Sequence, residues 1–174
     1  MSDTIEACPV CGFVWDDVDP ATVPGRVRTA TTAMAEVLRT HPDAMTQRPS
    51  PERWSGVEYA CHVRDVCWNL RDRIVLGAVE DVPIPHGLHT DDRIAMGLYT
   101  RDTPEITAGD LVVAGDVVAR TMECLPPELA ERTLIYGWPR VAERTLHWVA
   151  AQLLHECEHH LDDVRENVTL VAGG

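Results

Sequence analysis

The chain has 174 residues, 45% of them hydrophobic, which suffices for one domain around a single core and excludes a disordered protein. Its 28 acidic residues outweigh 15 basic ones, and the net charge of −13 argues against nucleic acid or an anionic membrane as a partner. The sequence has no run of about 18 apolar residues, so we expect no membrane-spanning helix. The acidic N-terminus lacks the apolar stretch of a signal peptide, and we therefore predict a cytoplasmic protein.

A short irregular segment, residues 1–20, is expected to precede a folded domain at residues 21–170. Within it, Cys8 and Cys11 form a Cys-x-x-Cys pair followed by Gly12, which resembles half of a zinc ribbon. The sequence has no second pair of this kind. Three interpretations stay open: a second metal site completed by a distant Cys or His, a redox pair, or a turn that packs over the domain.

Four long helical segments follow, without convincing strand alternation. They span Pro24–His41, Trp54–Val79, Pro104–Leu125 and Pro139–Val168, with a short helical turn at residues 92–98 inside the connection 80–103. Ser55 and Glu58 form a capping box, which marks the start of the second segment. This order of elements predicts an all-α protein, a four-helix bundle with long second and third connections.

Three histidines are the candidate metal ligands. His155 and His159 are four residues apart, which places both imidazoles on one face of the fourth helix. His62 lies on the inward face of the second helix, together with Val66 and Leu70. If the two helices are neighbours, three imidazoles converge on one ion. Three protein ligands are typical of a catalytic zinc site, although nickel, iron or manganese also suit imidazole.

His160 is expected to point about 100° away from its neighbour His159. We interpret it as a surface residue or as one that supports the ligands. Asp162 or Asp163 could accept the free N–H of a ligand histidine, or both could face solvent.

Aromatic and basic residues near the helix ends are candidates for the substrate-binding wall. They are Trp54, Trp138, Arg140 and Trp148. Among them, Arg140 could hold a substrate carboxylate. The alternative for each tryptophan is packing in the core.

The histidines belong to a longer pattern that resembles the DinB-like (DinB/YfiT) superfamily of metalloenzymes from about Val27 to Asn167. The matching signature is Trp54-Ser55-x-x-Glu58-x-x-x-His62-x-x-Asp65, then Leu146-His147-Trp148, then His155-x-x-x-His159-His160-x-x-Asp163. The resemblance implies a four-helix bundle and maps the family's metal triad onto His62, His155 and His159. Despite the family name, it does not imply DNA binding.

Characterised members of that family include thiol S-transferases that use bacillithiol or mycothiol, and a mycothiol-dependent maleylpyruvate isomerase. The isomerase branch is less similar, because it carries Glu where this chain has His155. The lysine-free composition is similar to that of high-GC actinobacterial proteins, which favours mycothiol. The resemblance therefore implies a metal-dependent thiol S-transferase, in which a metal-bound thiolate attacks a small electrophile.

Two other classes of function compete with the transferase. One is a hydrolase or isomerase on the same bundle, with metal-bound water as the nucleophile. The other is a non-enzymatic metal-binding module. An apolar face left over on the fourth helix would favour a homodimer.

Overall fold

The computed structural model describes residues 6–138 and 140–173. Four long helices form the architecture: α1 (Val23–Thr40), α3 (Gly56–Val79), α5 (Pro104–Cys124) and α6 (Leu146–Ala172). The shorter elements are α2 (Pro42–Met45), α4 (Thr90–Ala95), the strands β1 (Thr133–Tyr136) and β2 (Ala142–Thr145), and three 3-10 turns at Trp15–Asp17, Pro20–Thr22 and Pro127–Leu129. The predicted all-α four-helix bundle is confirmed. The first five residues, on which the expectation of no signal peptide partly depends, lie outside the described residues.

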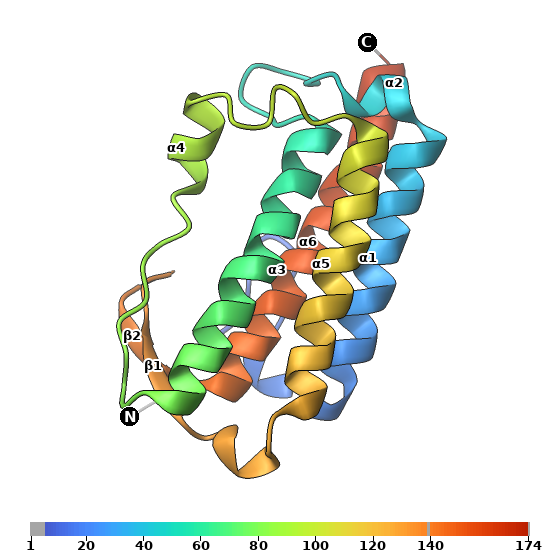
Figure 1. The fold of residues 1–174 in the computed structure, drawn as a ribbon. Helices are drawn as coiled ribbons and strands as arrows, with labels where there is room; N and C mark the ends of the chain where they lie inside the picture. Colours follow the sequence, from blue (N-terminus) through green and yellow to red (C-terminus); the bar gives the residue numbers. More distant parts are fainter. Residues whose placement is uncertain (1–5, 139, 174) are drawn as a thin grey trace.

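The helices do not simply alternate in direction along the chain. In Figure 1, α1 and α6 run upward while α3 and α5 run downward. Helix α1 packs against α5 and α6, and α3 packs against the same two helices. Because α3 and α5 are parallel, the chain must return along the bundle between them. Residues 80–103 make this return and carry α4 beside the bundle (Figure 1).

Side-chain caps fix where the helices begin. The Ser55 hydroxyl accepts a hydrogen bond from the Glu58 N–H, and the Glu58 carboxylate accepts one from the Ser55 N–H, so the predicted capping box is present. The Thr103 hydroxyl caps α5 in the same way. The Thr145 hydroxyl accepts from the Trp148 N–H and starts α6.

The predicted start of the fourth helix was wrong. Residues 133–145, read partly as helix, form an antiparallel hairpin in which Thr133 is opposite Thr145 and Tyr136 is opposite Ala142. Each strand has only four residues, which is too short for alternation to stand out in the sequence. The helix begins only after this hairpin, at Leu146. Pro139, the predicted first residue, lies outside the described residues.

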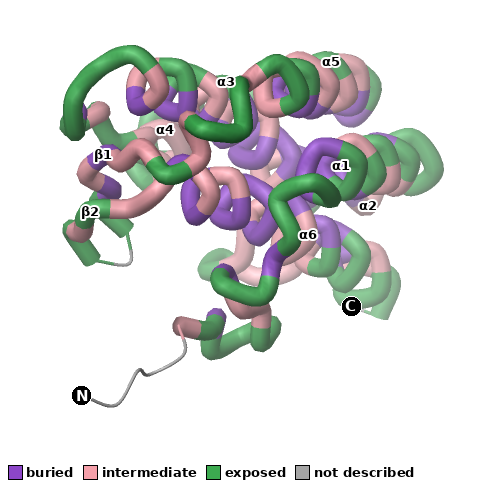
Figure 2. The backbone as a smooth tube through the Cα atoms, turned by 90° about the horizontal axis from the view of Figure 1, so that it is seen from below, coloured by how far each residue is buried: buried purple, intermediate pink, exposed green. Residues whose placement is uncertain are grey.

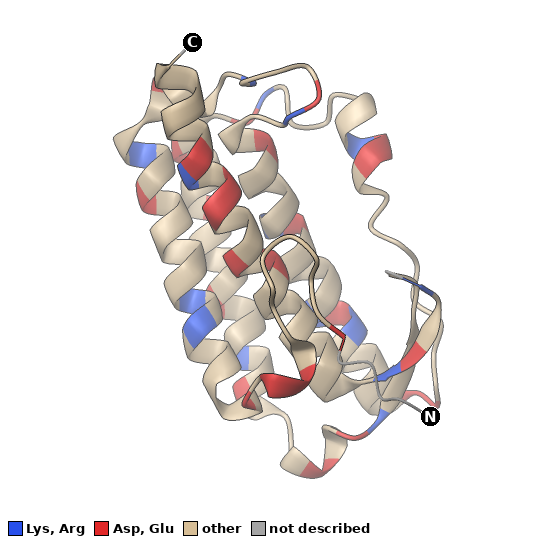
Figure 3. Ribbon diagram, turned by 180° about the vertical axis from the view of Figure 1, so that it is seen from behind, with Lys and Arg blue, Asp and Glu red and all other residues tan. Residues whose placement is uncertain are grey.

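The N-terminal segment packs on the bundle. Trp15 is 3% exposed, and Cys8 and Val18 are buried in the same hydrophobic core as the helices. Seen from behind, the loop of this segment lies across the bundle (Figure 3). Glu6 forms an ion pair of 2.7 Å with Arg144 on β2. Buried positions otherwise follow the inner faces of the long helices (Figure 2).

In the described part of the chain, no helix is both long enough and apolar enough to cross a bilayer. Acidic positions are spread over the helices and connections (Figure 3). This distribution agrees with the strongly negative net charge of the sequence.

Two glycines of α5 give a test of how closely the helices pack. A methyl group at Gly115 would lie 2.9 Å from Thr31 Cγ2 and 3.0 Å from Thr31 Cβ on α1, whereas at Gly109 it would meet nothing within 4 Å. We expect Gly115→Ala to lower the free energy of unfolding by about 1–3 kcal/mol through overpacking. Gly109→Ala should instead raise it by about 0.5–1 kcal/mol through helix propensity.

Urea denaturation of both variants measures this difference. Equal effects of the two substitutions would contradict the close contact between α1 and α5.

Candidate metal centre

Helix α6 presents two pairs of potential ligands, and each pair is four residues apart. His155 and His159 form one pair, and Glu156 and His160 form the other. Since successive residues on a helix point about 100° apart, the two pairs face different neighbours. One pair faces α3, and the other faces the N-terminal segment.

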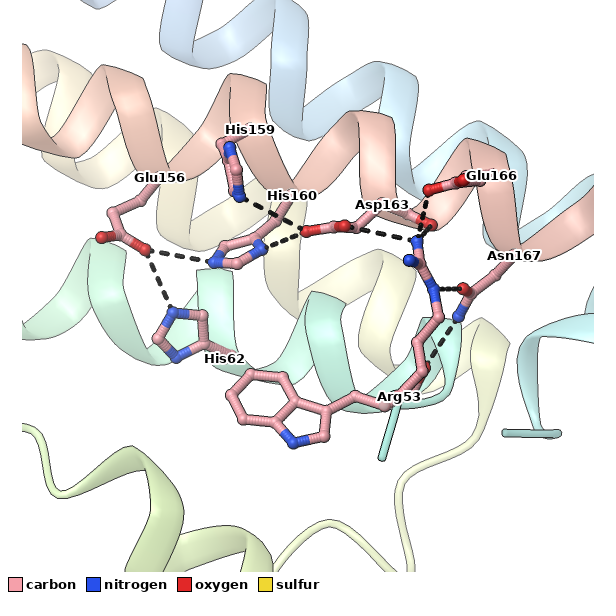
Figure 4. Close-up of polar contacts among 9 residues, drawn as sticks. Arg53, His62, Glu156, His159, His160, Asp163, Glu166 and Asn167 are labelled. Carbon is pink, nitrogen blue, oxygen red and sulfur yellow. Dashed lines mark hydrogen bonds and ion pairs between the residues drawn. The ribbon is translucent and has the colours of Figure 1, made fainter. Parts of the chain in front are cut away.

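The first group combines His62 of α3 with Glu156 and His160 of α6. The Nε2 atom of His62 lies 3.1 Å from Glu156 Oε2, and the Nε2 atom of His160 lies 3.3 Å from the same oxygen. Figure 4 shows the two imidazoles approaching this carboxylate from opposite helices. Two nitrogens and one oxygen therefore converge on a single point between α3 and α6.

Neighbouring polar groups hold these three side chains in place. Thr90 Oγ1 lies 3.3 Å from His62 Nδ1, and Asp163 Oδ2 lies 2.8 Å from His160 Nδ1. The Gln152 amide donates a 2.6 Å hydrogen bond to Glu156 Oε1. In each of these three side chains, one polar atom is thus held by a neighbour, and the other polar atom faces the other two side chains. Partners of this kind commonly orient metal ligands.

Asp163 is itself fixed by Arg53, near the C-terminal end of α6 (Figure 4). The Arg53 guanidinium donates hydrogen bonds of 2.6 Å to Asn167 Oδ1 and 2.9 Å to Glu166 Oε2. The support of the first group therefore extends to the loop before α3.

The charges of the first group are coupled. Burial would raise the pKa of the Glu156 carboxyl, but hydrogen bonds with His160 and His62 hold that pKa far below its usual range. Burial disfavours the charged form of His160, but Asp163 and Glu156 raise its pKa to about 9. Without a metal, His160 thus keeps a proton at neutral pH, and metal uptake would release it.

The geometry of this group fits a metal ion. A tetrahedral ion with bonds of about 2.0–2.2 Å places its ligand atoms roughly 3.3–3.6 Å apart. The observed 3.1 and 3.3 Å separations are close to this spacing. Two imidazoles and one carboxylate are a common set for zinc and for other first-row divalent metals.

The second group consists of Cys8, Cys11, His155 and His159, whose ligand atoms all lie within 4.8 Å of one another. His155 is 4% exposed, and neither of its ring nitrogens has a hydrogen-bond partner among the described residues. Burial lowers the pKa of this imidazole to about 4, so the ring is neutral. Neutral imidazole is the form that binds metals.

A third group shares residues with the other two. It contains His159, His160 and Asp163, with His159 Nε2 3.8 Å from Asp163 Oδ2. Because Asp163 already pairs with His160 and Arg53, we interpret it as a support for both histidines.

The predicted triad is divided between the two main groups. His62 does not share a group with His155 and His159 but with Glu156 and His160. The physical reason is helix phase, since the position next to a ligand turns by about 100° and meets a different partner. Both pairs on α6 have the same spacing, so the sequence alone could not choose between them. His160, which the sequence analysis interpreted as a surface or supporting residue, is 14% exposed and faces Glu156, so it lies inside the site, where it either supports the ligands or binds the ion itself.

The first group and three members of the second, Cys8, His155 and His159, line one cavity of about 640 Å³. The cavity lies between α3, α6, the connection 80–103, the hairpin connection and the N-terminal segment. Two of the predicted wall residues, Trp54 and Trp138, line it as well. The other two do not belong to this lining among the described residues. Trp148 is buried and stacks on Trp15 at 5.9 Å between ring centroids, and Arg140 is exposed.

The cavity has a different arginine, which the sequence analysis missed. Arg73 of α3 is 8% exposed, lines the cavity and donates a 2.5 Å hydrogen bond to the backbone carbonyl of His86. Its Nε atom has no hydrogen-bond partner in the described part of the chain. Burial lowers the pKa of this guanidinium. Its position eleven residues after His62, about three helical turns, was the available signal.

Comparison with known proteins assigns the family. The sequence model described as the DinB superfamily matches residues 26–164. The chain belongs to the DinB superfamily. The family resemblance expected from the histidine pattern is thereby confirmed, and the four-helix bundle agrees with it.

A solved structure, YfiT from Bacillus subtilis, has the same fold as this DinB superfamily chain. The TM-score is 0.77 at 12% sequence identity, and the match covers 85% of each chain. That protein is described as a probable metal-dependent hydrolase with an unusual four-helix bundle topology. No curated protein matches the chain.

Proposed function

We propose that the chain is a metal-dependent enzyme whose ion is held by His62, Glu156 and His160. One observation carries this proposal: two imidazole nitrogens from different helices converge on one carboxylate oxygen at the wall of a cavity of about 640 Å³. Three protein ligands leave a coordination position for a substrate, which is the arrangement of catalytic sites. The cavity volume lies in the range of small-molecule sites.

The reaction that we favour is transfer of a low-molecular-weight thiol to an electrophilic small molecule. A bound metal would deprotonate a coordinated thiol and so supply a nucleophile at neutral pH. His62 and His160 would hold the ion as neutral ligands, with their orientation fixed by Thr90 and Asp163, while Gln152 fixes the orientation of Glu156. The resemblance to DinB-like transferases supports mycothiol as the thiol. It leaves zinc as the preferred metal, with nickel, iron and manganese as alternatives.

The lining of the cavity suggests the chemical class of the electrophile. Arg73 supplies a buried cation, and Leu70, Trp54 and Trp138 supply apolar surface. A guanidinium binds carboxylates through paired hydrogen bonds. We therefore propose a small, partly apolar electrophile that carries a carboxylate.

A hydrolase is the second candidate. It is supported by the description of the similar B. subtilis protein and by the two-histidine, one-glutamate set, which also occurs in zinc hydrolases. The two candidates differ in one requirement, since only the transferase needs a thiol.

Calorimetric titration with mycothiol, on metal-loaded and chelator-treated protein, tests the transferase. We expect mycothiol to bind only the metal-loaded form and aryl halide acids to turn over faster than their methyl esters. Ester or amide hydrolysis without any thiol would instead support the hydrolase. Protein that binds no metal at the His62 group would contradict both candidates and leave a non-enzymatic bundle.

The remaining expectations stay predictions. They are a homodimer, the absence of nucleic-acid and membrane partners, and a cytoplasmic location. Exposed apolar residues on the long helices, among them Val113 and Leu170, are where a second copy would be sought.

A further inference from the structure

The Cys8–Cys11 segment folds into a tight turn. The Cys8 N–H donates a hydrogen bond of 2.8 Å to the Phe13 carbonyl, and the Gly12 N–H donates one of 2.9 Å to the Cys8 carbonyl. Ala7 and Val14 close the turn as an antiparallel bridge. Gly12 has a φ of 74°, which a glycine adopts without strain. The turn brings both sulfur atoms to the same side, toward α6.

His155 faces this turn in an environment that gives it no conventional partner. Its ring lies 5.2 Å from Phe13, 5.0 Å from Trp15 and 6.2 Å from Trp138, measured between centroids. Both ring nitrogens are buried without a hydrogen bond within the residues that the structure describes. Burying a polar group without a hydrogen-bond partner is energetically unfavourable. The protein groups around His155 therefore supply no partner for its ring nitrogens, and a bound metal ion would supply one.

We propose that Cys8, Cys11, His155 and His159 bind a structural zinc ion. The four ligand atoms lie within 4.8 Å of one another. Their spacing is Cys-x-x-Cys on the turn and His-x-x-x-His on the helix, which matches the usual ligand spacing of Cys2His2 zinc sites. Four protein ligands close the coordination sphere, so this zinc ion has a structural role and is distinct from the ion at the His62 group.

The zinc ion joins two parts of the chain that are far apart in sequence. Binding displaces one proton from each thiol, and the two thiolates balance the charge of the ion. The ion then fastens the N-terminal segment to the middle of α6. Since Cys8, Pro9 and Val10 line the cavity, the same ion fixes one wall of the candidate active site.

The Cys8→Ser/Cys11→Ser double variant tests this site, with Cys124→Ser as the matched control. Cys124 is exposed and belongs to neither main group. Untagged protein is loaded with zinc, and its metal content is measured. We expect the double variant to lose about one zinc equivalent per chain. The control should lose none.

Cobalt substitution identifies the ligands directly. We expect wild-type protein to show the sulfur-to-cobalt charge-transfer band of a thiolate site, and the double variant to lack it. Alkylation gives a test without any substitution, since Cys11 is exposed but should resist modification until a strong chelator is added.

Two results would overturn the proposal. The first is unchanged zinc content together with an absent charge-transfer band. The second is ready oxidation of zinc-treated wild-type protein to a Cys8–Cys11 disulfide, which would indicate a redox pair. His62→Ala separates this site from the proposed function, because it should remove the other ion and leave the charge-transfer band intact.

Discussion

Replacing Glu156 by Gln is expected to lower the affinity for the metal ion proposed at the His62 group by more than about 100-fold, with a matching loss of any activity that depends on it. Substitution of residues that merely orient ligands already costs about 10–100-fold, and Glu156 would be a ligand itself. Its carboxylate is the point on which His62 and His160 converge, at 3.1 and 3.3 Å. The amide has the same shape but no charge. Because the buried pair with His160 is lost as well, stability should also decrease, and metal affinity is compared under conditions in which both proteins are folded.

Competition with a chelator of known affinity measures the change. Glu158→Gln is the matched control, because Glu158 lies on the same helix but pairs with Arg26 at the surface. An exposed pair of this kind contributes about 0–1 kcal/mol, and the control should bind metal as wild type does. If Glu156→Gln bound metal with wild-type affinity, Glu156 would not be a ligand, and the triad His62, His155 and His159 expected from the sequence would be the alternative.

Replacing Trp15 by Ala is expected to lower the free energy of unfolding by about 3–5 kcal/mol. Trp15 is 3% exposed, stacks on Trp148 and contacts His155. Its indole N–H donates a 2.7 Å hydrogen bond to Gln152, whose amide in turn holds Glu156. The substitution therefore leaves a cavity and an unsatisfied Gln152 amide oxygen beneath the N-terminal segment. We accordingly expect a decrease in the free energy of unfolding near the upper end of this range.

Denaturant unfolding at matched metal content measures the loss. Trp68→Ala is the control, since Trp68 of α3 is 39% exposed and should cost less than half as much. An equal cost at both positions would mean that the N-terminal segment contributes little to the stability of the bundle.

The two metal groups are physically connected through α6. Gln152 lies one turn before Glu156 and receives the Trp15 hydrogen bond, so the segment that carries Cys8 and Cys11 also contacts the support of the His62 group. Loss of the structural zinc ion should therefore weaken the cavity wall and, through Gln152, the orientation of Glu156. The two ions remain separable, because they share no ligand.

The sequence by itself determined the bundle and the ligand-bearing elements. The helical period, the Ser55 and Glu58 capping box and the run from His155 to Asp163 depend only on local spacing, and spacing along one helix is fixed by the backbone. These features predicted α3 and α6 as the helices that carry ligands. The Cys-x-x-Cys spacing of Cys8 and Cys11 left a metal site completed by distant residues as one of three interpretations.

Only the tertiary structure decided which side chains meet. His155 and His159 have the same spacing as Glu156 and His160, and the choice between them depends on the rotation of α6 against α3 and the N-terminal segment. That rotation results from packing over the whole core, which no local pattern encodes. The same holds for Arg73, which lines the cavity from α3, whereas Arg140 of the hairpin connection does not belong to the lining although its neighbours Gly137 and Trp138 do.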